Sequence, residues 1–166
     1  MNKLEIPVNN SVAYSLGFML WGGSLNKNRF RMVSKHNRKA LQTIRNVFPS
    51  VRPASLLFRQ RNNSNELDIT STGLAHSLER VRSNLWNVSK NFTSSQVGSF
   101  MRGYFERRGS VGRSNVVLRF NDEIIALWFV EHLVRRSMNP SLIEVKPNRW
   151  IVRIKSKDIP RFFRFV

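Results

Sequence analysis

Arginine and lysine are the residues of this sequence whose number and spacing indicate a chemical role. The 166 residues contain 28 of them against 10 aspartates and glutamates, a formal net charge of +18. A folded protein with this charge repels itself, and a polyanion such as a nucleic-acid backbone relieves the repulsion. Arginine outnumbers lysine, and its planar guanidinium can hold a phosphate with two hydrogen bonds or stack on a base. The composition therefore favours nucleic-acid binding over the alternative of a solvated basic surface.

Three short segments alternate cations with apolar residues. Arg149–Lys155 (RWIVRIK) places its cations on one face of a predicted strand and its apolar residues on the other. The same alternation occurs around Phe30 and around Phe58. We expect antiparallel sheets that pack on helices with one face and present cations to nucleic acid with the other. The residues predicted to bind nucleic acid are Arg29, Arg31, Lys35, Arg59, Arg61, Arg107, Arg108, Arg113, Arg119, Lys146, Arg149, Arg153 and Lys155.

Three acidic residues interrupt this basic pattern in the predicted strands, namely Glu66, Asp68 and Glu144. A carboxylate on a face that binds phosphate would oppose binding. These residues are therefore expected either to lie away from the contact or to form ion pairs with neighbouring arginines.

Other kinds of site find little support in the sequence. Cysteine is absent, which excludes disulfides and thiolate zinc sites. His36, His76 and His132 lack the spacing of metal ligands, and no cofactor or metal is expected. No apolar segment is long enough to span a membrane, and the cations do not gather on one amphipathic helix, so no membrane partner is expected.

The order of predicted elements occurs twice along the chain. Helical spacing of apolar residues, alternation and turn residues predict an α-β-β-α-β-β-α order in each half, in which the first strand of each pair is weakly marked. The predicted helices cover residues 11–21, 35–48, 72–88, 96–107, 122–136 and 157–165, with Asn121 as the cap of the fifth. The predicted strands cover 29–33, 55–59, 66–70, 114–120, 142–146 and 149–155, and turns at 62–65 and 147–148 close two hairpins.

Two glycine pairs support a duplication. Gly17 and Gly103 are separated by the same number of residues as Gly23 and Gly109. Equal spacing of this kind is the mark of an internal repeat. We expect repeats at 1–90 and 91–166 that form one compact, monomeric pseudo-dimer of the α/β (α+β) class.

The two glycine-containing helices carry a motif. SLGFMLWGG (residues 15–23) and MRGYFERRG (residues 101–109) resemble the signature of the LAGLIDADG homing endonucleases and intron maturases. The resemblance in element order covers essentially the whole chain, while only these two helices match at the level of the motif. It implies that the helices pack against each other at a pseudo-twofold axis, with basic sheets forming a saddle for nucleic acid. The residues it implies at the repeat interface are Gly17, Leu20, Gly103 and Tyr104.

The resemblance also implies a catalytic acid near the end of each motif helix, where divalent metals would activate water. The matching positions are Gly22 and Arg108, neither of which can serve as a metal ligand. Glu106 is the acid within the second motif, two residues away from that position. We therefore expect no enzyme activity and no catalytic residue, because the acid is missing from both motifs.

The type of nucleic acid is left open by the residues alone. One expectation is a protein that binds structured RNA, as an rRNA-binding component of an organellar ribosome or as a maturase-like binder of intron RNA. The alternative is a sequence-specific duplex-DNA-binding protein, such as a transcriptional regulator or a residual homing endonuclease. RNA is favoured because the basic, arginine-rich composition and asparagine-rich loops suit a small protein embedded in folded RNA. Other proteins of a ribonucleoprotein would then be partners, and the expected location is a mitochondrial or other organellar matrix, or else a bacterial, archaeal or viral-host cytoplasm.

Overall fold

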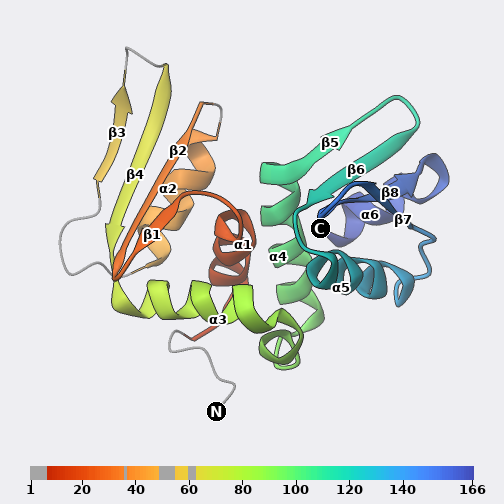
Figure 1. Ribbon diagram of the computed structural model, residues 1–166, viewed down its shortest axis with the longest axis horizontal. Coiled ribbons are helices and arrows are strands. Elements are labelled where there is room, and N and C mark those ends of the chain that lie inside the picture. Colours follow the sequence, from red (N-terminus) through yellow and green to blue (C-terminus); the bar gives the residue numbers. More distant parts are fainter. Residues whose placement is uncertain (1–6, 36, 49–54, 60–62) are drawn as a thin grey trace. The chain divides into compact units, whose positions relative to one another are not determined.

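The computed structural model describes residues 7–35, 37–48, 55–59 and 63–166, which form two compact units. The units are Met1–Gly103 and Tyr104–Val166, and the division falls inside one helix. Figure 1 shows the elements in chain order. The helices and strands up to the third helix are α1 (Asn10–Met19), β1 (Ser24–Asn26), β2 (Arg29–Ser34), α2 (Arg38–Val47), β3 (Ser55–Arg59), β4 (Ser64–Thr70) and α3 (Thr72–Ser89). The remaining elements are α4 (Ser94–Arg108), β5 (Gly109–Val111), β6 (Asn115–Phe120), α5 (Glu123–Val134), β7 (Ser141–Lys146), β8 (Arg149–Lys155), the 3-10 turn η2 (Ser156–Asp158) and α6 (Ile159–Phe165).

The predicted fold class is confirmed. The order α-β-β-α-β-β-α occurs twice, and each copy contains one four-stranded antiparallel sheet. The strand orders are β1-β2-β4-β3 and β5-β6-β8-β7, so the second sheet repeats the order of the first. In each sheet the second strand of the second hairpin pairs with the second strand of the first hairpin. These pairs are β4 with β2 and β8 with β6, and they join segments far apart in the sequence.

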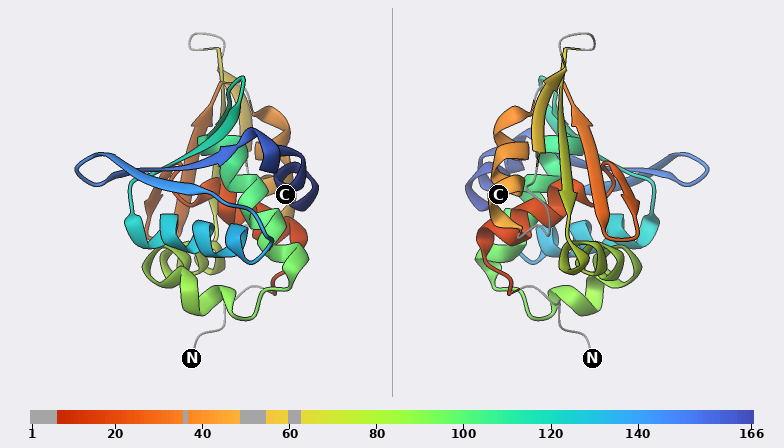
Figure 2. Two further views of the ribbon diagram at one scale, coloured as in Figure 1. Left: turned by 90° about the vertical axis from the view of Figure 1, so that its right-hand side faces the viewer. Right: turned by 90° about the vertical axis from the view of Figure 1, so that its left-hand side faces the viewer.

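One face of each sheet is covered by helices. In β2 the side chains of Phe30 and Met32 are buried while those at alternate positions are exposed. Helix α2 lies behind the first sheet (Figure 1), and α5 runs beneath the second (Figure 2). Burial of the aromatic side chains beneath the second sheet supplies much of the core of that unit. These side chains are Phe120, Trp128, Phe129 and Phe162, all essentially inaccessible to solvent.

Several predicted element boundaries are wrong. Asp122, rather than Asn121, caps α5, because its carboxylate accepts the backbone N–H of Ile125 at 3.0 Å. Helix α5 then ends at Val134, which leaves Arg135 after its last residue. Side-chain capping decides such positions, and two adjacent polar residues offer nearly equal local signals.

The first half departs from the predicted boundaries in the same way. Helix α2 begins at Arg38 rather than at residue 35, and β4 begins at Ser64 inside the predicted turn. Ser64 and Asn65 are buried, although their types favour turns. Helix α3 runs through to Ser89 with a kink at Asn84, whose φ and ψ are not helical. Pairing with β2 and β3 extends β4, so tertiary contacts override the local preference.

The two compact units do not coincide with the predicted repeats. The first part of α4, up to Gly103, groups with the first unit, although this helix opens the second copy of the element order. Contacts with α1 explain this grouping, as described below. The predicted repeats 1–90 and 91–166 are defined by the duplicated order of elements rather than by compactness, and they stay a prediction.

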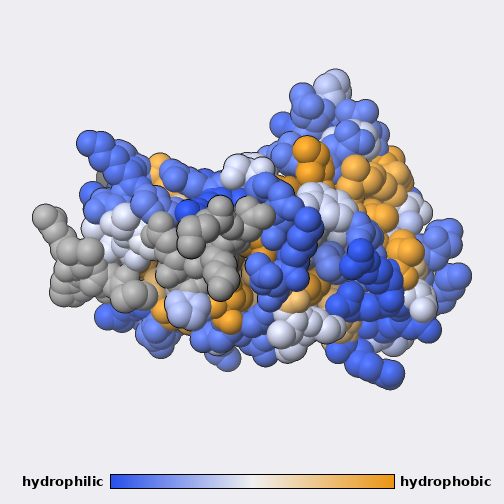
Figure 3. Space-filling model, turned by 90° about the horizontal axis from the view of Figure 1, so that it is seen from below, coloured by the Kyte–Doolittle hydropathy of each residue, from blue (hydrophilic) through white to orange (hydrophobic). Residues whose placement is uncertain are grey.

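Helix α5 is apolar on nearly all sides. Its inner face is buried, and Ile124, Leu127 and Val134 are also exposed at helical spacing on its outer face. In Figure 3, apolar side chains gather on the part of the surface at the right, which belongs to the second unit. None of the helices in the described part of the chain is long and apolar enough to cross a membrane.

Candidate nucleic-acid interface

Two glycines allow the two motif helices to approach each other at backbone distance. A Cβ atom added to Gly17 of α1 would overlap the carbonyl oxygen of Phe100 in α4 and lie 2.9 Å from the carbonyl carbon. A Cβ on Gly103 would overlap the carbonyl oxygen of Tyr14 and lie 2.9 Å from the backbone nitrogen of Phe18. Backbone atoms cannot move aside as side-chain tips can. Glycine is therefore required at both positions of this crossing.

Arg82 holds the C-terminal end of α1. Its Nε donates a hydrogen bond of 2.7 Å to the carbonyl oxygen of Leu20, and its Nη2 donates to that of Met19 at 3.4 Å. Its guanidinium also lies over the ring of Trp21, 5.9 Å from the centroid. Burial lowers the pKa of Arg82, while the charge of Glu79 opposes that shift. A cation at this end of a helix complements the partial negative charge of the last carbonyl groups.

Replacement of Arg82 by leucine is expected to lower the free energy of unfolding by about 1–3 kcal/mol, because two partly buried carbonyl groups lose a charged donor. Urea denaturation followed by circular dichroism measures this loss. Lys90→Leu is the control, since Lys90 is exposed at the end of α3 and loses only its charge. Equal midpoints for the two variants would contradict the capping role.

The positions that match the catalytic acids of the LAGLIDADG signature hold Gly22 and Arg108. Gly22 is buried in the turn after α1, where its N–H donates to the carbonyl oxygen of Met19 at 3.1 Å. Arg108 is the last residue of α4, and its charge has the same sign as that of a metal ion. Mg²⁺ prefers oxygen ligands, above all carboxylates. Within the described residues, no three His, Asp or Glu side chains gather as a metal site would require.

The end of α4 is strongly basic. Arg107 and Arg108 are half-buried in its last turn, and burial together with the charge of Arg108 lowers the pKa of Arg107. Glu106 is exposed.

Tyr104 lies in the core of the second unit, where its ring stacks on Phe120 at 4.8 Å. Its hydroxyl donates to the carbonyl oxygen of Arg119 at 2.7 Å, and burial raises its pKa. Tyr104, which was predicted at the repeat interface, thus lies in the aromatic core of the second unit.

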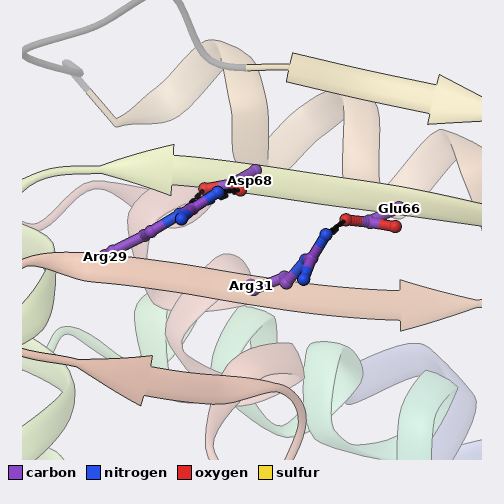
Figure 4. Close-up of polar contacts among 4 residues, drawn as sticks. All are labelled: Arg29, Arg31, Glu66 and Asp68. Carbon is purple, nitrogen blue, oxygen red and sulfur yellow. Dashed lines mark hydrogen bonds and ion pairs between the residues drawn. The ribbon is translucent and has the colours of Figure 1, made fainter.

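The first sheet neutralises the two arginines of β2. Arg29 forms a two-pronged ion pair with Asp68 of β4, in which its Nε lies 2.9 Å from Oδ1 and 3.0 Å from Oδ2 (Figure 4). Arg31 pairs with Glu66 through a single oxygen, since its Nε and its Nη2 both contact Oε1. Hydrogen bonding to Arg29 holds the pKa of Asp68 below its usual value. The first sheet therefore contains ion pairs between these acids and neighbouring arginines, which was one of the two arrangements expected from the sequence.

The second sheet carries cations without such partners. Arg119 of β6 aligns with Ile151 of β8, so Arg149 and Arg153 are its diagonal neighbours on the same face. Diagonal neighbours on adjacent strands lie about 7–8 Å apart. Lys155 continues the row along β8, and Arg149, Arg153 and Lys155 are all exposed. Among the described residues none of these four cations is in an ion pair, and Arg119 donates a hydrogen bond to the hydroxyl of Ser110.

Apolar residues lie between these cations. Val117, Ile143 and Ile151 share the outward face of the second sheet and are half-buried. Glu144, by contrast, aligns with Trp150, so the alternation assigns it to the opposite face. Its Oε1 accepts the backbone N–H of Asn148 at 3.3 Å. The outward face therefore combines cations with apolar surface and carries no carboxylate.

The other predicted binding residues are spread over the two units. Lys35 is exposed just after β2, Arg113 is exposed in the turn between β5 and β6, and Lys146 is exposed at the end of β7. Arg59 ends β3 and aligns with Ser64, while Arg61 lies outside the described residues. The structure therefore groups Arg119, Arg149, Arg153 and Lys155 on one face, with Lys146 opposite Arg149 at its edge, and leaves the others apart. Sequence reasoning missed Arg82, because its contacts with α1 connect positions far apart in the sequence.

The fold is that of the LAGLIDADG proteins. It contains two glycine-containing helices in close contact and two four-stranded antiparallel sheets with the same strand order. One solved structure with this fold is the homing endonuclease I-DmoI in complex with DNA and Mn, with a TM-score of 0.71 and 14% identity over 95% of this chain and 96% of that one. The N-terminal LAGLIDADG domain of DUF199/WhiA is also similar, with a TM-score of 0.65 and 17% identity over 97% of this chain and 84% of that one. Full-length DUF199/WhiA from Thermatoga maritima has a TM-score of 0.63 and 20% identity over 97% of this chain and 57% of that one.

Comparison at the level of sequence adds no family. No family model matches the chain, and no curated protein matches it. The similarity to I-DmoI and WhiA therefore establishes a LAGLIDADG-like fold for this chain.

Proposed function

We propose that this protein is a catalytically inactive, LAGLIDADG-like nucleic-acid-binding protein and that it binds structured RNA. The observation that carries the proposal is the outward face of the second sheet. There Arg119, Arg149, Arg153 and Lys155 share one face that carries no carboxylate. Such a row attracts a phosphate backbone and releases the counterions condensed on it.

The absence of nuclease activity rests on the motif helices. The reaction of this family needs carboxylates where Gly22 and Arg108 stand, and the arginine would repel the cation that the reaction needs. Arg82, bonded to the last carbonyl groups of α1, adds a further positive charge at the end of the first motif helix. The helix pair is thereby kept as a structural element without its reaction.

RNA is the proposed polymer because of the chemistry of the face. Guanidinium groups interleaved with half-buried Val117, Ile143 and Ile151 can contact phosphates together with riboses and unstacked bases. Arginine also stacks on exposed bases, which single-stranded loops of folded RNA offer. In that setting the protein belongs to a ribonucleoprotein, such as an organellar ribosome or an intron complex, and has protein neighbours there.

Sequence-specific binding of duplex DNA is the second candidate. It is favoured by the fold shared with I-DmoI, a structure that contains DNA and Mn. A twisted antiparallel sheet can follow the major groove and read base edges with a few side chains.

Binding of a fluorescent RNA stem-loop and of a DNA duplex of equal length, measured by anisotropy, tests the proposal. We expect tighter binding of the RNA, and an affinity that falls roughly 10³-fold or more between about 50 and 200 mM salt if six or more phosphates are contacted. Tighter binding of the DNA duplex than of the RNA stem-loop would support the second candidate instead. Binding of neither polymer at physiological salt would refute both.

Cleavage is tested separately. The same RNA, and DNA duplexes drawn from a random-sequence pool, are incubated with Mg²⁺ or Mn²⁺ and examined on denaturing gels. We expect intact strands. Metal-dependent cutting that disappears in Glu106→Gln would overturn the proposal that the protein is inactive.

A further inference from the structure

The two sheets have the same strand order but differ in the charge of their outward faces. On the first sheet, Arg29 and Arg31 meet Asp68 and Glu66 on the neighbouring strand. On the second sheet, the corresponding strands carry cations and no carboxylate on that face. The difference concerns the acids, since both faces have arginines.

The ion pairs of the first sheet oppose the binding of phosphate. A phosphate that approached Arg29 would also approach the carboxylate of Asp68, which is ionised at neutral pH. It would have to displace two hydrogen bonds from the Arg29 Nε and a further bond from Nη2. Glu66 is nearly buried beside Arg31, which fixes the second pair in place. The two cations and two carboxylates cancel, so the described face of β1, β2 and β4 has little net charge.

The positions of the acidic residues explain why the ion pairs form on the first sheet and not on the second. Asp68 and Glu66 occupy alternate positions of β4, on the same face as Arg29 and Arg31, and each arginine reaches the acid diagonally across the ladder. All six acidic residues of the second unit lie in helices, in capping positions, in η2 or on the opposite face of β7. The second sheet therefore keeps its full positive charge facing outward.

We propose that the RNA backbone lies on the outward face of the second sheet. The Arg29–Asp68 and Arg31–Glu66 ion pairs make the β2–β4 face unavailable for binding phosphate. This inference rests on the proposed function, because it assumes that a nucleic acid binds at all. The row from Arg149 to Lys155 follows one strand of seven residues, which spans roughly 20–23 Å at about 3.3 Å per residue. The contact is thus one-sided, along a single sheet rather than across two equivalent ones.

The experiment compares three variants of the full chain by anisotropy with the same RNA stem-loop over a salt series. Arg153→Gln/Lys155→Gln removes two charges from the second sheet. Arg29→Gln/Arg31→Gln/Glu66→Gln/Asp68→Asn removes both ion pairs from the first sheet and leaves the net charge unchanged. Arg38→Gln/Lys39→Gln removes two exposed charges from α2 as a control for net charge. Thermal unfolding confirms that each variant is folded.

We expect the second-sheet variant to bind at least tenfold more weakly and to lower the slope of log affinity against log salt by about 2. The four-residue variant of the first sheet should stay within about twofold of the unmodified protein, and the α2 control should lose less than the second-sheet variant. Equal losses for the first-sheet and second-sheet variants, or for the second-sheet variant and the α2 control, would overturn the inference while leaving nucleic-acid binding intact. An unmodified protein that fails to bind would refute the proposed function and this inference with it.

Discussion

Replacement of Gly17 by alanine is expected to lower the free energy of unfolding by about 3 kcal/mol or more. The added Cβ would overlap the backbone carbonyl of Phe100, and Gly103 faces Tyr14 in the same way on the other helix. Neither backbone can yield locally, so α1 and α4 would have to separate and expose the residues that they bury. Urea denaturation followed by circular dichroism measures the change.

Gly112→Ala provides the matched control. A Cβ at Gly112 would meet the Oδ1 atom of Asn115 at 3.1 Å, which is the tip of a flexible side chain that can turn away. We expect a loss below about 1 kcal/mol there. The double variant Gly17→Ala/Gly103→Ala should lose less than the sum of its parts, because one substitution already separates the helices. Additive losses, or a Gly17→Ala midpoint equal to that of Gly112→Ala, would refute the close approach.

Removal of the two acids of the first sheet is expected to increase the affinity for RNA. Glu66→Gln/Asp68→Asn keeps the shape of both side chains but releases Arg29 and Arg31 from their ion pairs. Two cations then become available on a face that was neutral. We expect binding about tenfold tighter and a salt slope steeper by about 2, again measured by anisotropy.

Glu79→Gln/Glu123→Gln is the control for this gain. Both glutamates are exposed on helices, so their removal raises the net charge by the same amount away from the sheet. The control should tighten binding by less than the sheet variant. If both variants bind alike, long-range attraction rather than local release of arginines accounts for the change.

Substitution at Asp68 should also alter the dependence of stability on pH. The pKa of Asp68 is lowered in the folded protein by hydrogen bonding to Arg29, so the pair contributes stability above the unfolded pKa near 3.8. That contribution is lost as the pH falls through the depressed folded pKa. Unfolding between pH 7 and about pH 2 should therefore show a steeper acid loss for the unmodified protein than for Asp68→Asn, and parallel curves would contradict the pair's contribution.

Local patterns were sufficient to predict most of the fold. The alternation of Arg149–Lys155 predicted a strand with an outward basic face, and the apolar spacing of residues 11–21 predicted a buried helix. Both signals depend only on periodicity, which a segment carries whatever surrounds it. Ends of elements were less certain, because the choice between Asn121 and Asp122 as a cap depends on a single hydrogen bond.

The positions that match the catalytic acids of the LAGLIDADG signature could be identified in the sequence. Gly22 and Arg108 can be identified by their distance from Gly17 and Gly103, and residue type alone tells whether a position can hold a metal. The fold confirmed by the structure gives those positions their context, whereas the absence of activity stays a prediction until it is measured.

The duplicated order of elements, the alternation of cations along the strands and the glycines of the motif helices can all be identified from the amino-acid sequence. Which of the cations are available for binding depends on the packing of the strands. Arg29 and Arg153 have the same local pattern, yet β4 brings Asp68 beside the first, while the strands beside β8 bring no acid to its face. The charge of a side chain is a property of its residue, whereas its ion pair depends on the neighbouring strand. The register of long-range backbone hydrogen bonds determines which residue of that strand lies beside it.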